Sequence, residues 1–147
     1  MANKMKSQAE CGVTSSFSLK SDISELKILA ENIENFGSDN GIPDKTVFEL
    51  NLVLDELFTN LVSYGCQSDR HKFEIIMKLK DGFLTLLIED DGHMFNPLKA
   101  PEPEMECACE ERKIGGLGIY FMRKIMDSIE YSWEDGKNKL KLVKNIQ

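Results

Sequence analysis

The sequence predicts a two-layer α/β sandwich of the α+β kind, with helices on one face of a mixed, mostly antiparallel sheet. Three observations favour this fold. Two pairs of strand-like runs occur, at 72–89 and 129–143, and each pair is joined by turn-forming residues. Two helix-like runs precede the first pair, and a third separates the pairs. Hairpins joined through helices are typical of a sheet covered on one face.

The composition bounds the class of protein. With 147 residues and 41% hydrophobic content, the chain suits one domain, expected at 13–147, behind a flexible tail at 1–12. A net charge of -7 argues against a nonspecific nucleic-acid binder. No apolar run approaches the roughly 20 residues of a membrane span. Lys4 and Lys6 precede no apolar segment of the kind found in secretion signals. A cytoplasmic protein with protein partners is expected.

The four cysteines are too few and too scattered for a disulfide framework. Cys107 and Cys109 form a C-x-C pair that could bind a metal or oxidise, but neither histidine is close in sequence. Reduced thiols in a loop, in a reducing compartment, are therefore expected.

The first elements are a strand and a helix. Val13 to Lys20 partly alternates apolar and polar residues, which predicts an edge strand. Ser21 or Asp22 can cap the helix that follows, whose apolar periodicity continues to Gly37.

The next helix is the element around which the chain is organised. Pro43 and Asp44 are a helix-start signal, and Gly65 is a plausible C-cap. At 100° per residue, one apolar stripe forms from Leu50, Val53, Leu54, Leu57 and Leu61. Glu56 and Asn60 lie one turn apart on its shoulder, where solvated polar residues or a binding cleft would both fit.

Strands and a long loop follow. Lys72 to Lys80 alternates, and Asp81-Gly82 connects it to a nearly all-apolar run, 83–89, which ends at Asp90, Asp91 and Gly92. The segment 96–113 has three prolines, five glutamates and neither a helical nor a strand period, so we predict a lid. A helix at 116–127 and strands at 129–134 and 139–143, around the turn 135–138, complete the order.

The nucleotide-binding motifs with simple patterns are absent. No G-x-x-x-x-G-K-[ST] occurs, and Gly116-Leu117-Gly118 lacks a third glycine at dinucleotide spacing. What remains is an ordered set of three boxes, which are E-L-F-T-N at 56–60, E-D-D-G-H-M-F-N-P at 89–97 and E-E-R-K-I-G-G-L-G-I-Y at 110–120. In this order and spacing the chain resembles the GHKL, or Bergerat-fold, ATPases, and within them the bacterial anti-sigma factor serine/threonine kinases.

The resemblance implies a role for each motif. Asn60 would bind Mg²⁺ that bridges the phosphates of ATP, and Glu56 would be the catalytic base. Asp90 would accept a hydrogen bond from the adenine amine, and Gly92 would let the backbone approach the base. The remaining ATP-binding residues would cradle the phosphates at a helix start, and they are Gly115, Gly116, Leu117 and Gly118.

The resemblance also implies a function and partners. It implies a transcription regulator that phosphorylates a STAS anti-anti-sigma protein, binds a sigma factor and acts as a homodimer, without direct contact to nucleic acid or membrane. The alternative is a nucleotide-gated protein-interaction module of the same fold without kinase activity. The retained Glu56 argues mildly against that alternative.

Overall fold

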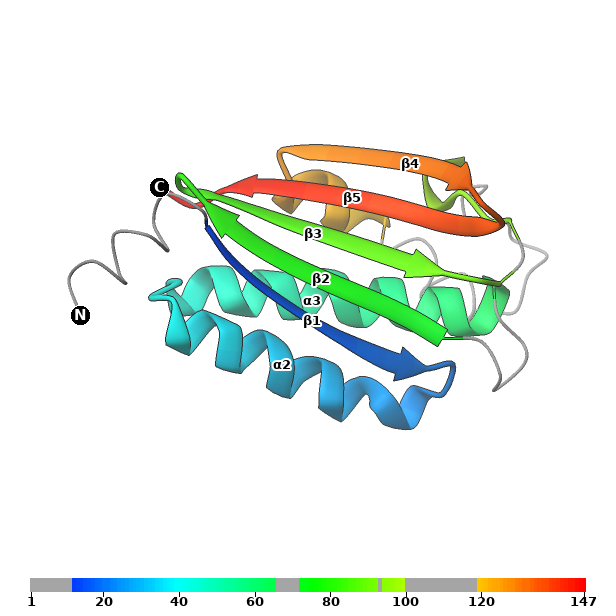
Figure 1. Cartoon of the computed structure of the whole chain (residues 1–147), viewed down its shortest axis with the longest axis horizontal. Helices are drawn as coiled ribbons and strands as arrows, with labels where there is room; N and C mark the ends of the chain where they lie inside the picture. The colour runs from blue at the N-terminus through cyan, green and yellow to red at the C-terminus, as the bar shows by residue number, and fades with distance from the viewer. Residues whose placement is uncertain (1–11, 66–71, 93, 100–118) are drawn as a thin grey trace.

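The computed structural model describes residues 12–65, 72–92, 94–99 and 119–147 (Figure 1). In chain order the elements are β1 (Val13–Lys20), a 3₁₀ turn (Ile23–Glu25), α2 (Leu26–Asp39), α3 (Asp44–Asn60), a π-helical turn (Leu61–Gly65), β2 (Lys72–Lys80), β3 (Phe83–Asp90), a 3₁₀ turn (Pro97–Lys99), β4 (Ser128–Glu134) and β5 (Lys137–Asn145). Residues 119–125 are helical and lie between the second 3₁₀ turn and β4.

The five strands form one sheet in the order β1-β2-β3-β5-β4. Every neighbouring pair is antiparallel. The edge position predicted for β1 is confirmed. The predicted fold class is also confirmed, since helices cover a sheet in which all four described pairings are antiparallel.

The core lies between one face of the sheet and the helices. Along β2 the inward residues Phe73, Ile75 and Met77 are buried, whereas Glu74 and Lys78 are exposed. The apolar stripe of α3 packs into the same cluster, and all five of its predicted residues are buried. The period-2 pattern of the strands and the 3.6-residue pattern of α3 therefore meet in one core.

Helices α2 and α3 pack closely because residue 37 is a glycine. A Cβ built on Gly37 would lie 2.5 Å from Cγ2 of Val47, which no real contact allows. At the start of α2, Asp22 caps the 3₁₀ turn by accepting from the Ser24 N–H at 2.9 Å. The predicted cap is thus confirmed, although the first turn is 3₁₀ rather than α.

The helix α3 begins at Asp44, directly after Pro43, as predicted. It does not run as an α-helix to Gly65. After Asn60 the backbone hydrogen-bond pattern changes from α-helical to π-helical, over Leu61–Gly65. Gly65 therefore ends this π-helical turn and does not cap α3. Such single π turns are frequent at functional sites.

Both hairpins have two-residue turns. Asp81 and Gly82 have φ of 53° and 79°, and Asp135 and Gly136 have 55° and 72°. Two positive φ angles complete a turn whose twist matches the strands. The prediction of a four-residue turn at 135–138 is therefore wrong, since Lys137 already pairs with Glu134 and β5 begins there.

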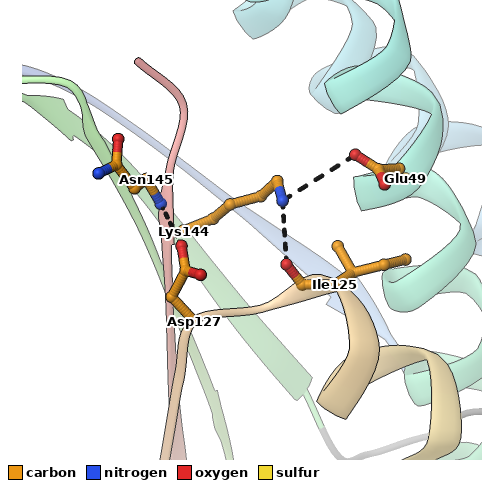
Figure 2. Close-up of polar contacts among 5 residues, drawn as sticks. All are labelled: Glu49, Ile125, Asp127, Lys144 and Asn145. Carbon is orange, nitrogen blue, oxygen red and sulfur yellow. Dashed lines mark hydrogen bonds and ion pairs between the residues drawn. The ribbon is translucent and has the colours of Figure 1, made fainter.

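The last strand is tied to two helices (Figure 2). The Lys144 ammonium donates to the Ile125 carbonyl at 2.9 Å and lies 4.0 Å from a carboxylate oxygen of Glu49 on α3. Beside it, the Asn145 N–H donates to the Asp127 carboxylate at 2.6 Å. These contacts fix the C-terminal end of helix 119–125 against β5 and α3.

Several predictions fall outside the described residues. These are the tail up to residue 11, both members of the C-x-C pair and most of the predicted lid, 100–113. Trp133 lies on β4, within the strand predicted at 129–134, and has 39% of its surface exposed.

Within the part of the chain described, no helix combines the length and apolar character needed to cross a membrane.

Candidate functional site

Three elements carry predicted site residues to the same end of the molecule. In Figure 1 the C-terminal end of α3, the C-terminal end of β3 and the start of β5 lie together at one end. Glu56 and Asn60 come from α3, and Asp90 is the last residue of β3. Residues separated by about 30 positions in the sequence are thus brought to one region by the fold.

Asn60 is the most informative polar residue of α3. Only 2% of its surface is exposed, and its Oδ1 is buried with no hydrogen-bond partner among the described residues. A buried carbonyl oxygen without a partner costs about 1 to 3 kcal/mol, so it persists where something else supplies a partner. The π-helical turn begins at the next residue.

Glu56 lies one turn before Asn60 and is partly buried. Burial raises the pKa of Glu56, and the negative charge of the neighbouring Asp55 raises it further. A carboxylate with a raised pKa is a better proton acceptor near neutral pH than a fully solvated one. The base role predicted for Glu56 is therefore compatible with its raised pKa and stays a prediction.

Asp90 is the centre of a buried hydrogen-bond network. It is 4% exposed, and its Oδ1 accepts from the Gly92 N–H at 2.9 Å and from Nδ2 of Asn138 at 3.0 Å. The amide oxygen of Asn138 accepts in turn from the Phe95 N–H at 2.9 Å and from the Tyr131 hydroxyl. This carboxylate is therefore held inside the domain and is not exposed to solvent at the end of the hairpin.

Asp91 is exposed, and its carboxylate accepts from the Lys72 N–H at 3.2 Å. Gly92 is buried beside Asp90. Four predicted ATP-binding residues lie outside the described residues, and they are Gly115, Gly116, Leu117 and Gly118. The structure therefore brings together the first two sequence boxes and leaves the role of the third as a prediction.

Asn138 and Tyr131 are not among the site residues predicted from the sequence. Asn138 lies in the predicted turn 135–138, although it precedes the buried Leu140 and Leu142 at period 2. With a two-residue Asp135-Gly136 turn, that spacing places Asn138 on the inward face. The Asp135-Gly136 dipeptide, which is typical of a two-residue turn, was therefore the sequence signal that could have placed Asn138 on the strand.

The residues present fit a magnesium ion. Mg²⁺ takes hard oxygen ligands, keeps several waters and often uses only one or two protein groups beside substrate phosphates. The unpartnered amide oxygen of Asn60 is such a group. Among the described residues no cluster of three or more acidic, histidine or cysteine side chains competes as a metal site.

Comparisons with known proteins bear on the family and the fold of the chain. The model of the histidine kinase-like ATPase domain family matches residues 19–144. The serine/threonine-protein kinase BtrW of Bordetella bronchiseptica is 31% identical over 97 residues, covering 65% of this chain and 68% of BtrW. The serine-protein kinase RsbW of Bacillus mycoides is 25% identical over 103 residues, covering 67% of this chain and 64% of RsbW. The match thus spans about two thirds of the length of each relative.

Solved structures share the fold. The crystal structure of the RsbU and RsbW domains of a Mycobacterium tuberculosis protein superposes with a TM-score of 0.64 at 11% identity, covering 91% of this chain and 32% of that chain. A blue-light activated histidine kinase domain from Erythrobacter litoralis gives a TM-score of 0.53 at 13% identity, covering 87% of this chain and 62% of that chain. Since the family model covers most of the chain, this protein belongs to the histidine kinase-like ATPase domain family.

Proposed function

We propose that this chain is a serine/threonine protein kinase that uses Mg-ATP to phosphorylate a STAS anti-anti-sigma protein and that binds a sigma factor. The observation that carries the proposal is the pair on α3, a buried amide oxygen without a described partner one turn after a carboxylate whose pKa is raised. The relatives named serine and serine/threonine kinases support the enzyme class. The STAS and sigma partners follow from the sequence resemblance.

In this proposal the residues of the chain divide the work. Asn60 would hold Mg²⁺, which when bound neutralises phosphate charge. Asp90 would accept from the adenine amine. Glu56 would take the proton of the attacking hydroxyl while the hydroxyl oxygen forms a bond to the γ-phosphorus. The bond between that phosphorus and the bridging oxygen of ADP would break. The proton ends on the Glu56 carboxylate, so charge and atoms balance.

The test begins with capture of partners. The full chain is immobilised and exposed to lysate of its native cell with Mg-ATP or with Mg-ADP, and bound proteins are identified by mass spectrometry. Nucleotide-dependent retention of a STAS protein or a sigma factor supports the proposal. Retention of neither contradicts the partner assignment.

Phosphate transfer to the captured STAS protein is then measured with labelled ATP. Glu56→Gln should abolish transfer and leave ADP binding within about twofold, since the amide keeps the shape but cannot take a proton. Glu34→Gln, the same change at an exposed position of α2, is the control and should retain transfer. If wild type binds Mg-ATP but transfers nothing, the protein is instead a nucleotide-gated binding module.

A further inference from the structure

The Asp90 carboxylate is oriented from the β4–β5 hairpin. Asn138 and Asp90 are direct partners in the antiparallel register of β3 and β5, and both side chains are buried with 4% of their surface exposed. Asn138 donates to Oδ1 of Asp90, and the Gly92 N–H donates to the same oxygen. Two donors on one oxygen fix the plane of the carboxylate and hence the direction in which its Oδ2 faces.

Asn138 is itself fixed from behind. Its amide oxygen accepts from the Tyr131 hydroxyl and from the Phe95 N–H, and these two donors determine which side of the amide faces Asp90. Burial raises the pKa of Tyr131, and the charge of Asp90 raises it further, against a lowering by the Phe95 backbone. The hydroxyl therefore stays protonated and acts as a donor at neutral pH.

An asparagine suits this position better than other side chains. A side chain at position 138 must donate to a carboxylate on one side and accept from two donors on the other. An amide provides the donor and the acceptor in one plane. An aspartate would place two carboxylates in contact, and a leucine of similar size would remove one donor from Asp90 and leave the Phe95 N–H without this acceptor.

We propose that Asn138, held by Tyr131, is a positioning residue that fixes both the Asp90 carboxylate and the backbone at Phe95, and so sets the preference of the site for adenine. The inference rests on the proposed role of Asp90. It adds that base preference is determined by a hairpin outside the three sequence boxes. Phe95 begins the segment that leads into 97–99, so the same amide also anchors that segment.

The test compares binding of ADP and IDP, each with Mg²⁺, by titration calorimetry on the full chain. The base of IDP has an oxo group in place of the amine, so a well-oriented carboxylate favours ADP. Asn138→Leu should weaken ADP binding by about tenfold or more and IDP binding much less, because the lost hydrogen bond involves a charged group. Tyr131→Phe should reduce the ratio of ADP affinity to IDP affinity less than Asn138→Leu does. Asn145→Leu, at the other end of β5, is the matched control.

A second variant separates positioning from folding. The exchange Asp90→Asn with Asn138→Asp restores a hydrogen-bonded pair but moves the charge to position 138. It should recover the melting temperature relative to Asn138→Leu without recovering the preference for ADP. Equal losses for ADP and IDP in Asn138→Leu, or a full ADP preference in the exchange variant, would overturn the proposal. If wild type binds ADP but the variants give either of these results, the positioning role of Asn138 is refuted and the proposed kinase function stands. If wild type binds neither ADP nor IDP, both the positioning role and the kinase function are refuted.

Discussion

At the scale of single residues, the α3 helix carries three buried side-chain oxygens with no hydrogen-bond partner in the described part of the chain. They belong to Asn51, Asp55 and Asn60. Asn60 lies on the same shoulder as Glu56, whereas Asn51, nine residues earlier, is on the opposite side of the helix. A buried amide oxygen without a described partner therefore occurs on both sides of α3, which makes Asn51 a control for Asn60.

Asn60→Ala should weaken ADP binding about tenfold in the presence of Mg²⁺ and much less in EDTA, since a lost metal ligand matters only when the metal is present. Calorimetric titrations with and without Mg²⁺ measure the two values. Asn51→Ala should leave both unchanged. An equal loss with and without Mg²⁺ in Asn60→Ala would refute the metal role.

Asp55→Asn should stabilise the protein at pH 7. Burial raises the pKa of Asp55, so the folded state binds a proton more tightly than the unfolded chain does. The resulting penalty on folding is present above the raised pKa and disappears as the pH falls below the ordinary value of about 3.9.

Urea unfolding at several pH values between 7 and 4 measures this difference. The advantage of Asp55→Asn over wild type should shrink toward pH 4. Glu31→Gln, an exposed change of the same charge on α2, corrects for the net charge of -7. An advantage that is independent of pH would show that the Asp55 carboxylate carries no burial penalty.

At the scale of elements, the sequence patterns predicted strands and helices well where one face is buried. β2, β3 and α3 match their periodicity within a residue or two at the predicted ends, except for the π-helical turn after Asn60. Local periodicity reports which face is buried and not how a helix widens at its end. The misplaced start of β5 has the same origin, because polar Lys137 and Asn138 resemble turn residues until their pairing with Glu134 and Trp133 is seen.

Lys144→Met should lower stability by about 1 to 2 kcal/mol. Methionine keeps the apolar stem but removes the ammonium from the Ile125 carbonyl and the Glu49 carboxylate (Figure 2). Chemical denaturation measures the change, and Lys141→Met, on an exposed position of β5, is the control. Equal effects of the two substitutions would mean that the Lys144 contacts do not hold helix 119–125 in place.

At the scale of the whole molecule, one core joins the sheet to α2, α3 and helix 119–125, and the site residues extend from that core. A ligand that binds only this folded arrangement stabilises it by mass action, by about 2.7 kcal/mol at a hundred times its dissociation constant. Nucleotide binding is therefore measurable as stability of the entire domain.

Mg-ADP at that concentration should raise the melting temperature by about 5 to 10 °C in a chain of this size. Differential scanning fluorimetry measures the shift, with Mg²⁺ alone as the control. Asp90→Asn should reduce it, because the adenine amine loses its charged acceptor. The absence of any shift in wild type would exclude adenine nucleotide as a ligand.

The sequence by itself determined the two-layer fold, the order of the elements, and the residues of α3 and β3 on which the proposed site depends. It could do so because burial imposes a period on each element, and because the nucleotide boxes are local in the chain. Only the tertiary structure decided how Asp90 is held. Its partner, Asn138, is 48 residues away in the sequence and reaches it through the pairing of β3 with β5. A hydrogen bond between strands depends on register and turn length together, and no local pattern contains both.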